Sequence, residues 1–405
     1  MLVNLGNHYV SDFIKTEQDY QDRKKYSLDL ILDQEIGAAK LTEMAPSHTM
    51  WGKYWYRSGI NATMKKELGD IVKEVTSRIK TQQGDIWLDI ACNDGTLLSQ
   101  IPSEFTKLGI DPCDDSYFNE SSKYAKVVQD YFSYDAYQRT GHGDEKAKVI
   151  TTIAMFYDLL DPHPFISDIV KVLDDNGVWV VQMSYTPLML KQLAFDNICH
   201  EHVYYYSLNS IKKLFAQHGL KIVDCSLNDV NGGSFRVYVQ KDIAEVASFG
   251  TSPLRDVCNF RVQSILDYEN NHFDISKPEV WKEFMTNIEL LKKQTVDFIK
   301  QAKAEGKVVC GYGASTKGNT LLQWFELDHT MIDAIAERSP YKFGLKTIGT
   351  DIPILSEEEV RAMKPDYMIV LPWHFISEFI SREDEFLTNG GKFIVPCPKF
   401  EIIGK

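Results

Sequence analysis

The stretch "IWLDIACNDGTLL" (residues 86–98) decides the fold of this 405-residue chain. A run of apolar residues predicts a buried strand that ends at Asp89, and "ACNDG" predicts a tight turn into a helix that opens at "TLLSQ" (96–100). A turn made of Asn93, Asp94 and Gly95 lets a ligand approach the backbone closely. Strand, turn and helix in this order are typical of a nucleotide-binding α/β domain.

Acidic residues end the next two predicted strands. Asp111 follows about twenty residues after the turn, where a carboxylate can accept hydrogen bonds from both ribose hydroxyls, and Asp130 comes at the end of "KVVQD" (126–130), where it could meet an adenine edge. The turn is not G-x-G-x-x-G, and the acid before it disfavours a pyrophosphate. We therefore expect S-adenosylmethionine, an adenosyl cofactor with a positive charge and no phosphate, rather than a turn without a ligand. The expected cofactor-binding residues are Asp89, Ala91, Asn93, Asp94, Gly95, Asp111 and Asp130.

Short apolar runs alternate with amphipathic stretches over much of the chain, which indicates an α/β fold with two Rossmann-like domains. Helices are expected at 61–80 and 278–306, and strands are expected within residues 86–90, 107–111, 126–130, 148–156, 177–184, 220–227 and 235–240, then within 307–315, 331–337, 367–373 and 392–398. The predicted organisation is a small N-terminal substrate-side domain (1–75), a cofactor-binding domain (76–245), a helical connector (246–300) and a C-terminal α/β domain (301–405).

Composition excludes several classes of protein. The chain is 44% hydrophobic with a net charge of −13, and no apolar run approaches the ~20 residues of a membrane helix, so we expect neither a nucleic-acid nor a membrane partner. The N-terminus lacks the layout of a signal peptide, which favours a cytoplasmic protein, and a monomer or weak dimer is expected. Seven scattered cysteines without a C-x-x-C pair predict neither a disulfide framework nor a cysteine zinc site.

The segment "FDNICHEHVYYYS" (195–207) has three possible interpretations. His200 and His202 would share one face of a strand and could bind a metal, but no third ligand has suitable spacing, so no metal is expected. The run of tyrosines could be an aromatic seam of the core. The third interpretation is acid–base chemistry, because methyl transfer to carbon needs a carbanion, and a histidine beside Glu201 suits the removal of a proton next to a ketone.

A second glycine turn lies in "VVCGYGASTKGNTLLQWF" (308–325). Gly311 and Gly313 precede a predicted helix whose N-terminus can bind an anion, and Lys317 adds a positive charge there. Glu337 follows the next strand, where a nicotinamide nucleotide would need an acid. Taken alone, this half could therefore belong to a dehydrogenase.

Both key segments resemble those of the S-adenosylmethionine-dependent sugar C-methyltransferases, typified by the tetronitrose 3′-C-methyltransferase of tetrocarcin biosynthesis. "DIACNDGTLL" (89–98) resembles E/D-x-G-x-N-D-G-T-L-L, and "FDNICHEHVYYYSL" (195–208) resembles F-D-x-I-x-H-E-H-x-x-Y-x-S, within a likeness that spans residues 26–402. It implies methylation at C-3 of a nucleotide-diphospho 4-keto-6-deoxy sugar through an enolate. The base then falls on His202, with Glu201 beside it.

The chain departs from the family at three places. Ala91 and Cys92 replace Gly-Ser in the cofactor turn, which keeps the turn open. Cys199 stands where the family has an active-site tyrosine, and a thiol is a weak hydrogen-bond donor. In "LDLILDQEIG" (28–37), Asp33 and Ile36 occupy the positions of zinc-binding cysteines, so we predict an N-terminal module without zinc.

The same resemblance implies further contacts with the substrate. Tyr54 and Tyr56, in "YWYRSG" (54–59), would lie over the sugar and polarise its keto oxygen. The remaining substrate contacts it implies are Ser58, Cys199, Asn231 and Ser234 for the sugar, and Ser315, Lys317, Asn319, Arg338 and Lys342 for the diphosphate. Two alternatives stay open: a nicotinamide-dependent sugar-nucleotide oxidoreductase, and a non-catalytic protein that binds a sugar nucleotide.

Overall fold

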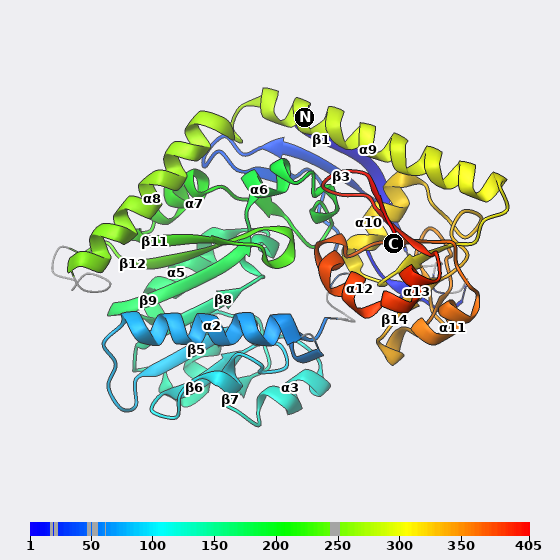
Figure 1. Ribbon diagram of the computed structural model, residues 1–405. Helices are drawn as coiled ribbons and strands as arrows, with labels where there is room; N and C mark the ends of the chain where they lie inside the picture. Colours follow the sequence, from blue (N-terminus) through cyan, green and yellow to red (C-terminus); the bar gives the residue numbers. More distant parts are fainter. Residues whose placement is uncertain (17–18, 20–22, 47–49, 51–55, 61, 244–251) are drawn as a thin grey trace.

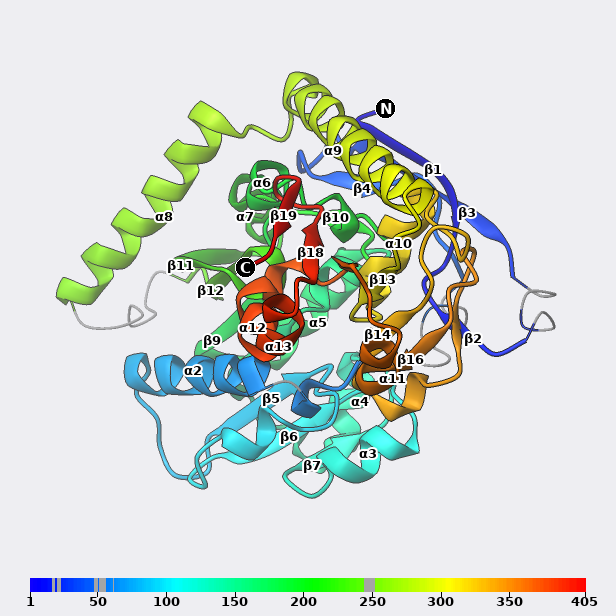
Figure 2. The ribbon, with the colours of Figure 1, turned by 45° about the vertical axis from the view of Figure 1, so that its right-hand side comes forward.

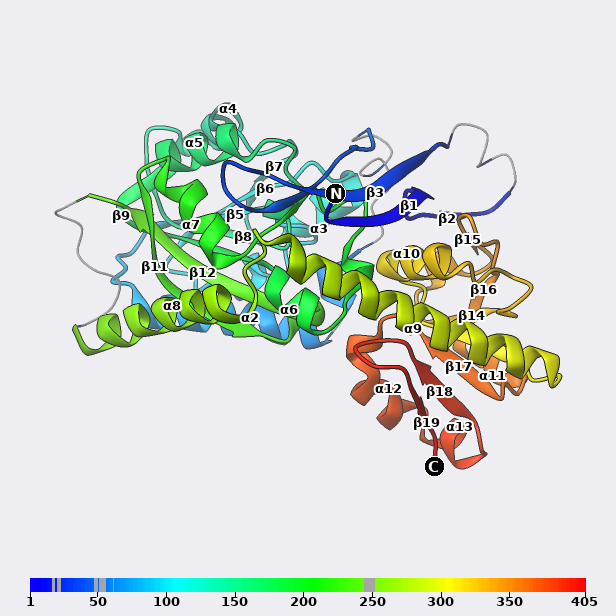
Figure 3. The same ribbon diagram turned by 90° about the horizontal axis from the view of Figure 1, so that it is seen from above.

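Two α/β units lie side by side, and the N-terminal strands and two long helices connect them (Figure 1). The computed structural model describes residues 1–16, 19, 23–46, 50, 56–60, 62–243 and 252–405. Figure 3 shows helix α9 (Pro278–Ala304) reaching over the C-terminal unit, while α8 (Ser252–His272) lies along the first unit. Among the described residues, no helix combines the length and hydropathy that crossing a bilayer requires.

The first unit is built on a seven-stranded sheet of order β11-β12-β9-β8-β5-β6-β7. Its strands are β5 (Ile86–Ile90), β6 (Thr106–Ile110), β7 (Lys126–Val128), β8 (Ala147–Ile153), β9 (Leu173–Ser184), β11 (Leu220–Asn228) and β12 (Ser234–Lys241). β5 pairs in parallel with β6 on one side and with β8 on the other. The chain therefore leaves β5 in one direction and later returns on the other side, and such a switch point opens a crevice at the carboxyl end of the strand.

Helices cover both faces of this sheet (Figure 2): α2 (Ala62–Arg78), α3 (Asp115–Ser121), α4 (Tyr134–Tyr137), α5 (Pro162–Val172), α6 (Thr186–Lys191) and α7 (Leu208–Ala216). The prediction of a helix that opens at 96–100 is wrong, because only a 3₁₀ turn forms there, Leu98–Gln100. Ile101 adopts an extended backbone after this turn. Pro102 follows, and the residue before a proline is disfavoured in the helical conformation, so the helix stops.

The C-terminal unit has a six-stranded sheet of order β16-β14-β13-β17-β18-β19. Its strands are β13 (Val309–Tyr312), β14 (Ile335–Glu337), β16 (Ile354–Ser356), β17 (Tyr367–Val370), β18 (Lys392–Val395) and β19 (Glu401–Ile403). Its helices are α10 (Thr316–Phe325), α11 (Glu357–Ala362), α12 (Ile376–Arg382) and α13 (Asp384–Thr388). The first five strands run parallel and only β19 is antiparallel, which agrees with the predicted Rossmann-like unit.

The N-terminal strands pair with strands from both α/β units. β1 (Val3–Tyr9), β3 (Lys25–Leu32) and β4 (Ala39–Leu41) pair in order, and β10 (Tyr204–Tyr205) closes the sheet from the first α/β unit. β2 (Phe13–Ile14) pairs instead with β15 (Lys346–Thr347) of the C-terminal unit. The N-terminal residues therefore join the two α/β units through backbone hydrogen bonds.

Glu269 attaches α8 to the first unit, a role that the sequence did not reveal. Its buried carboxylate accepts hydrogen bonds from the Tyr185 hydroxyl at 2.6 Å and from the backbone N–H of Leu208 at 2.6 Å and of Asn209 at 2.9 Å. Leu208 and Asn209 open helix α7. The carboxylate therefore satisfies two of the N–H groups that a helix start leaves without a partner in the helix.

We predict that Glu269→Gln lowers the free energy of unfolding by about 2 kcal/mol, because it removes a charged acceptor of several hydrogen bonds from a buried position. Urea unfolding followed by circular dichroism measures this difference. Asp267→Asn, an exposed acid on the same helix, is the matched control and should stay within about 0.5 kcal/mol of the wild type. Equal stability of the two variants would contradict the role of Glu269.

Candidate active site

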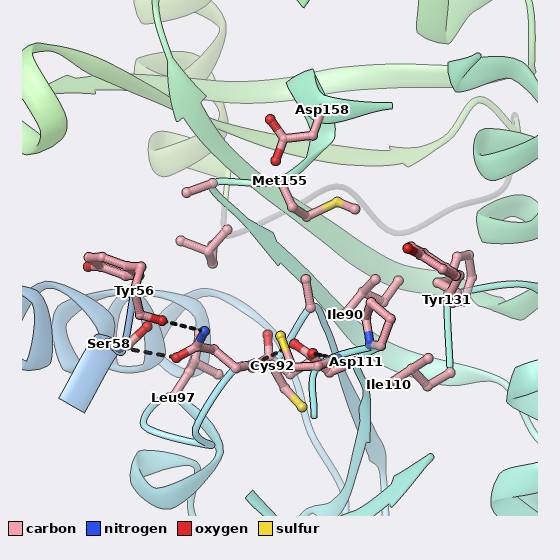
Figure 4. Close-up of a pocket in the computed structure, with 18 of the residues that line it drawn as sticks. Tyr56, Ser58, Ile90, Cys92, Leu97, Ile110, Asp111, Tyr131, Met155 and Asp158 are labelled. Atoms are coloured by element: carbon pink, nitrogen blue, oxygen red, sulfur yellow. Dashed lines mark hydrogen bonds between the residues drawn. The ribbon is translucent and has the colours of Figure 1, made fainter. Parts of the chain in front are cut away.

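A cavity of about 340 Å³ opens at the carboxyl end of β5, where the switch point of the sheet lies (Figure 4). Its walls are mostly apolar, and the acids that line it are Asp89, Asp111 and Asp158. None of the described residues that line it is a lysine or an arginine. A cavity with carboxylic acids and without a cationic side chain suits a positively charged ligand and does not suit a phosphate.

Asp111 fixes the turn after β5 and also faces the cavity. Its carboxylate accepts hydrogen bonds from the backbone N–H of Asn93 at 2.7 Å and of Cys113 at 2.8 Å. These bonds hold the side chain at the end of β6, at the place expected for the acid that binds ribose hydroxyls.

The polar side chains of the turn have a different task from the one we expected. The Asn93 carboxamide accepts a hydrogen bond from the Ser58 N–H and donates one to the Tyr56 carbonyl oxygen, both at 3.1 Å, and Asp94 accepts from the Gly59 N–H at 2.8 Å. Tyr56 and Ser58 thereby become walls of the cavity. The turn therefore holds the segment 56–59 in place beside the cofactor site.

Three of the expected cofactor contacts lie outside the cavity. Asp94 faces the segment 56–59, and the Asp130 carboxylate pairs with Arg139 on the surface. Gly95 has a φ of +76°, and a Cβ atom there would come within 2.7 Å of the Ser121 Cα. Packing and the backbone conformation both require glycine at 95. Asp89, Ala91, Asn93 and Asp111 do line the cavity.

Asp89 is a buried acid at the floor of the cavity. Its carboxyl group accepts a hydrogen bond from the Thr151 hydroxyl at 2.6 Å. Burial raises the pKa of Asp89 to about 7, with a smaller contribution from the nearby charge of Asp111. Near neutral pH, a cation bound in the cavity would therefore favour the ionised form of Asp89.

The two histidines of the 195–207 segment do not share a face. The segment forms a 3₁₀ turn, Phe195–Asn197, and then an irregular turn instead of the strand that the metal interpretation assumed. His200 contacts the carbonyl oxygen of Tyr26 through Nε2 at 3.1 Å, and His202 contacts the carbonyl oxygen of Asn197 through Nδ1 at 2.9 Å. Within the ranges that the structure describes, no three metal-binding side chains come together.

The surroundings of His202 fix its tautomer and its charge. A carbonyl oxygen can only accept, so Nδ1 carries the proton and the lone pair is on Nε2. Burial, aided by the charge of Lys317, lowers the pKa of His202 to about 3, so the ring is neutral at physiological pH. The ring of Tyr157 lies 4.2 Å away, centroid to centroid, and holds the imidazole in place.

Two carboxylic acids lie close to His202. Glu201 Oε2 and Asp158 Oδ1 are buried without a hydrogen-bond partner among the described residues. Burial raises the pKa of both groups, and the charge of Glu201 raises that of Asp158 further. The Cys199 thiol, which replaces the family's tyrosine, forms a hydrogen bond with Glu201.

Asp158, Tyr157 and Asn197 were not predicted from the sequence. Asp158 follows the carboxyl end of β8, the strand that lies next to β5. Residues at this edge of a parallel sheet contact ligands regularly, so the position of "FYD" (156–158) after a predicted strand was a usable signal.

Lys317 lies at the start of α10, buried beside the 195–202 segment. Its ammonium group donates a hydrogen bond to the Asn197 carboxamide oxygen. Burial lowers the pKa of Lys317, and this effect is opposed by Asp196, Cys199 and Glu201. The cation that we expected at a diphosphate thus contacts Asn197 in the 195–202 segment.

Comparisons with known proteins agree with this geometry. A family model described as a methyltransferase domain matches residues 60–224, and one described as a C-methyltransferase C-terminal domain matches residues 229–398. C-methyltransferase NovU from Streptomyces niveus is 28% identical over 388 residues, which are 96% of this chain and 90% of that protein. The chain therefore contains a methyltransferase domain followed by a C-methyltransferase C-terminal domain.

Solved methyltransferases resemble part of the chain. N-methyltransferase NodS from Bradyrhizobium japonicum WM9 is 13% identical, with a TM-score of 0.34 over 45% of this chain and 99% of that one. Magnesium protoporphyrin IX methyltransferase from Synechocystis PCC 6803, solved with bound SAH, is 12% identical, with a TM-score of 0.35 over 47% of this chain and 90% of that one.

The methyltransferase domain that matches residues 60–224 agrees with S-adenosylmethionine as the cofactor. The cavity fits it, because acids surround the space and no cationic side chain of the described residues lines it. Asp111 and Asp89 both line the cavity, so either carboxylate could contact a bound cofactor. When bound, the cofactor supplies a methyl group on a positively charged sulfur.

The remaining residues expected to bind the substrate are spread over the structure. Tyr54 lies outside the described residues, as does the side chain of Asn231. Ser234, Ser315 and Asn319 hydrogen-bond to the protein itself, at Val230, Gly318 and Asp12. Lys342 donates to the carbonyl oxygen of Ala314 at 2.7 Å, whereas Arg338 is exposed on the surface.

The second glycine turn does not leave an acid for a nicotinamide nucleotide. Both oxygens of Glu337 are occupied, one by the Ala314 N–H at 3.0 Å and the other by the N–H groups of Arg338 and Ser339. The acid that favoured the oxidoreductase alternative therefore stabilises the loop around the turn.

A carboxylate holds the N-terminal turn at the position of the family's zinc cysteines. Asp33 accepts hydrogen bonds from the Glu35 N–H at 3.0 Å and from the Lys40 ammonium group at 2.8 Å. Burial opposes ionisation here, but these bonds prevail and lower the pKa of Asp33. The turn is thus fixed by groups of the chain itself.

We predict that Asp111→Asn weakens cofactor binding about tenfold or more, because hydrogen bonds that involve a charged group contribute about 1.5–3 kcal/mol each. Isothermal titration calorimetry with S-adenosylmethionine measures the affinity. Asp130→Asn, which changes an acid outside the cavity, should leave the affinity within about twofold. The assignment of the ribose site is wrong if both variants bind as tightly as the wild type.

Cofactor affinity should rise as the pH increases from 6 to 8. The pKa of Asp89 is raised to about 7, so the carboxyl group is mostly protonated below this pH, and binding a cation favours the ionised form and releases a proton. Titrations at several pH values test this expectation. In Asp89→Asn the pH dependence should disappear, and a slope that persists unchanged in this variant would assign it to another group.

Proposed function

We propose that this protein is a C-methyltransferase that adds a methyl group to C-3 of a nucleotide-diphospho 4-keto-6-deoxy sugar, through an enolate intermediate. The observation that carries the proposal is the tautomer of His202, which presents an unprotonated Nε2 in a buried position while Nδ1 is held by Asn197. Transfer of a methyl group to carbon requires such a base, whereas transfer to oxygen or nitrogen needs little help.

His202 would take the proton from the carbon next to the ketone. Because its Nδ1–H bond fixes the ring, Nε2 keeps one direction relative to the substrate, and positioning of this kind contributes strongly to the rate. Glu201, next in the chain, would contact the sugar or orient it. The new carbon–carbon bond forms as the enolate carbon takes the methyl group, and the proton stays on His202 until it is released to solvent.

Tyr56 would contact the sugar from the side of the cofactor cavity. The residue is 43% exposed, and partial burial together with the nearby charge of Asp94 raises the pKa of its phenol to about 12. The phenol therefore keeps its proton at neutral pH and can donate a hydrogen bond to a keto oxygen. Tyr54 would assist it.

The nucleotide would lie toward the C-terminal α/β unit. Arg338 is the exposed cation there, close to the glycine turn, and it would meet the diphosphate. Lys317 is better suited to the sugar end, because it contacts Asn197 and lies near Glu201. The sugar-nucleotide class itself is supported by the resemblance of residues 195–208 to the sugar C-methyltransferases.

The direct test is incubation with labelled S-adenosylmethionine and a panel of 4-keto sugar nucleotides, followed by mass spectrometry. One added methyl group on a sugar nucleotide, located at C-3 by nuclear magnetic resonance, is the expected result. Tight binding of both ligands without turnover on any member of the panel would favour the alternative of a non-catalytic binding protein.

We predict that His202→Asn lowers the methylation rate by about 10²–10⁴-fold, the usual contribution of a general base, while cofactor affinity is retained. Single-turnover assays and calorimetry separate these two effects. His142→Asn, on the surface of the first unit and paired with Glu145, is the control and should keep full activity. If His202→Asn methylates at the wild-type rate, His202 is not the base and the proposed mechanism is wrong.

A further inference from the structure

Asp158 lies where the cofactor cavity meets the catalytic segment. It lines the cavity, and Figure 4 shows its carboxyl group on the cavity wall above Met155. The residue before it, Tyr157, packs against His202 and accepts a hydrogen bond from the Val203 N–H at 2.9 Å. The reacting carbon must lie between the methyl donor in the cavity and the imidazole, so Asp158 is beside that place.

The carboxyl group of Asp158 has unused hydrogen-bonding capacity. Its Oδ1 atom is buried and without a partner among the described residues, and the same holds for Oε2 of Glu201. Isolated buried polar atoms are costly, so each one needs a water, an ion or a ligand to complete it, or has a catalytic role. Asp158 also lines the cavity, so its carboxyl group is placed to contact a ligand there.

Charges around the two acids favour one proton on the pair. Like charges in a shared buried site disfavour double ionisation, and burial raises the pKa of both groups. Lys317, from α10, is the cation that faces Glu201 and favours its ionised form. The proton is thereby directed to Asp158, for which no cation contributes. The other titratable groups that face the pair are Asp12, Cys199 and Tyr205.

A buried neutral histidine is a weak base, so the enolate needs strong help at its oxygen. The charge that develops on the keto oxygen is best stabilised by a hydrogen-bond donor that is already in place. A protonated carboxylic acid in an apolar site is such a donor, as ketosteroid isomerase illustrates. A neutral acid beside the ketone would therefore compensate for the weakness of the base.

We propose that Asp158, in its protonated form, is a catalytic residue that donates a hydrogen bond to the keto oxygen of the substrate and stabilises the enolate, with Glu201 as the ionised partner of the pair. This inference rests on the proposed function, because it needs a ketone beside the reacting carbon.

Atoms and electrons balance in this step. The C–H proton goes to Nε2 of His202, and the electron pair of that bond moves into the enolate, whose oxygen accepts the hydrogen bond from Asp158. When the carbon takes the methyl group, the ketone re-forms, and the carboxyl proton remains on Asp158. No oxidant or additional reactant is required.

The test compares Asp158→Ala, which removes the donor, with Asp161→Asn, a change of an exposed acid three residues away that begins α5. Two readouts are used: the methylation rate and the exchange of the C-3 hydrogen of the substrate with deuterated solvent. We expect both rates to fall by about 10²–10³-fold in Asp158→Ala, with cofactor affinity within about threefold, and no change in Asp161→Asn, since asparagine also caps a helix well. Wild-type rates of exchange and methylation in Asp158→Ala overturn the inference.

A pH profile separates a catalytic role of Asp158 from a structural one. The wild-type rate should fall as the pH rises through the pKa of Asp158, because the active form is protonated. In Glu201→Gln the charge that raises this pKa is gone, so the fall should occur at lower pH. A profile that stays at the same pH in Glu201→Gln overturns the inference even if Asp158→Ala does not fold.

Failure of the inference and failure of the proposed function give different results. If the wild-type protein neither exchanges the C-3 hydrogen nor methylates any 4-keto sugar nucleotide, the proposed function is wrong, and the role of Asp158 is rejected with it. If the wild type does both, and His202→Asn does neither while Asp158→Ala does both at the wild-type rate, only the role of Asp158 is rejected.

Discussion

The backbone of Val203 holds the active site together. Its N–H donates to the Tyr157 carbonyl oxygen at 2.9 Å, and its carbonyl oxygen accepts from the Leu41 N–H at 3.0 Å. The first bond reaches the strand edge of the cofactor-binding unit, and the second reaches the N-terminal sheet that β10 continues. His202 directly precedes this residue, so the orientation of the base depends on the docking of two separate parts of the chain. Backbone bonds of this kind are stiffer than side-chain contacts and leave the imidazole little freedom.

Side chains of the C-terminal unit also contact the segment that carries His202. Lys317 contacts Asn197, and the indole N–H of Trp373 donates to the Asp196 carboxylate at 3.1 Å. Burial shifts nearly every titratable group here toward its neutral form: His202 stays unprotonated, and the pKa of Asp196 rises to about 6. Burial and the few charges near it hold the polar groups of this site in fixed directions before a substrate enters. Such an arrangement stabilises charge that develops during the reaction, since little reorganisation remains to be made.

Local patterns in the sequence predicted the strands and both glycine turns, because a buried parallel strand reads as a continuous apolar run and a tight turn needs small residues. Asp111 was predicted in the same way, whereas the resemblance to the sugar C-methyltransferases assigned the base to His202. Three features could not be predicted because they depend on contacts between residues far apart in the chain. These are the hydrogen bond from Asn93 to the segment 56–59, the contact of Lys317 with Asn197, and the two-residue strand β10. The missing helix after Gly95 is a different case, because Pro102 is visible in the sequence and explains it. Asp158 follows a predicted strand, so its position was a usable signal, but its closeness to Glu201 depends on contacts between distant residues.

The turn at Asp33 has a consequence for how folding responds to the environment. The resemblance to the sugar C-methyltransferases places zinc-binding cysteines at this turn, whereas here the Asp33 carboxylate, with a lowered pKa, accepts hydrogen bonds from Glu35 and Lys40. A group with a lowered pKa contributes stability above its unfolded-state pKa and loses that contribution as the pH falls through the folded-state value. This turn is consequently linked to proton activity and not to metal supply. Chelators and thiol oxidants would disrupt a turn held by cysteines and zinc. They do not react with a turn held by a carboxylate.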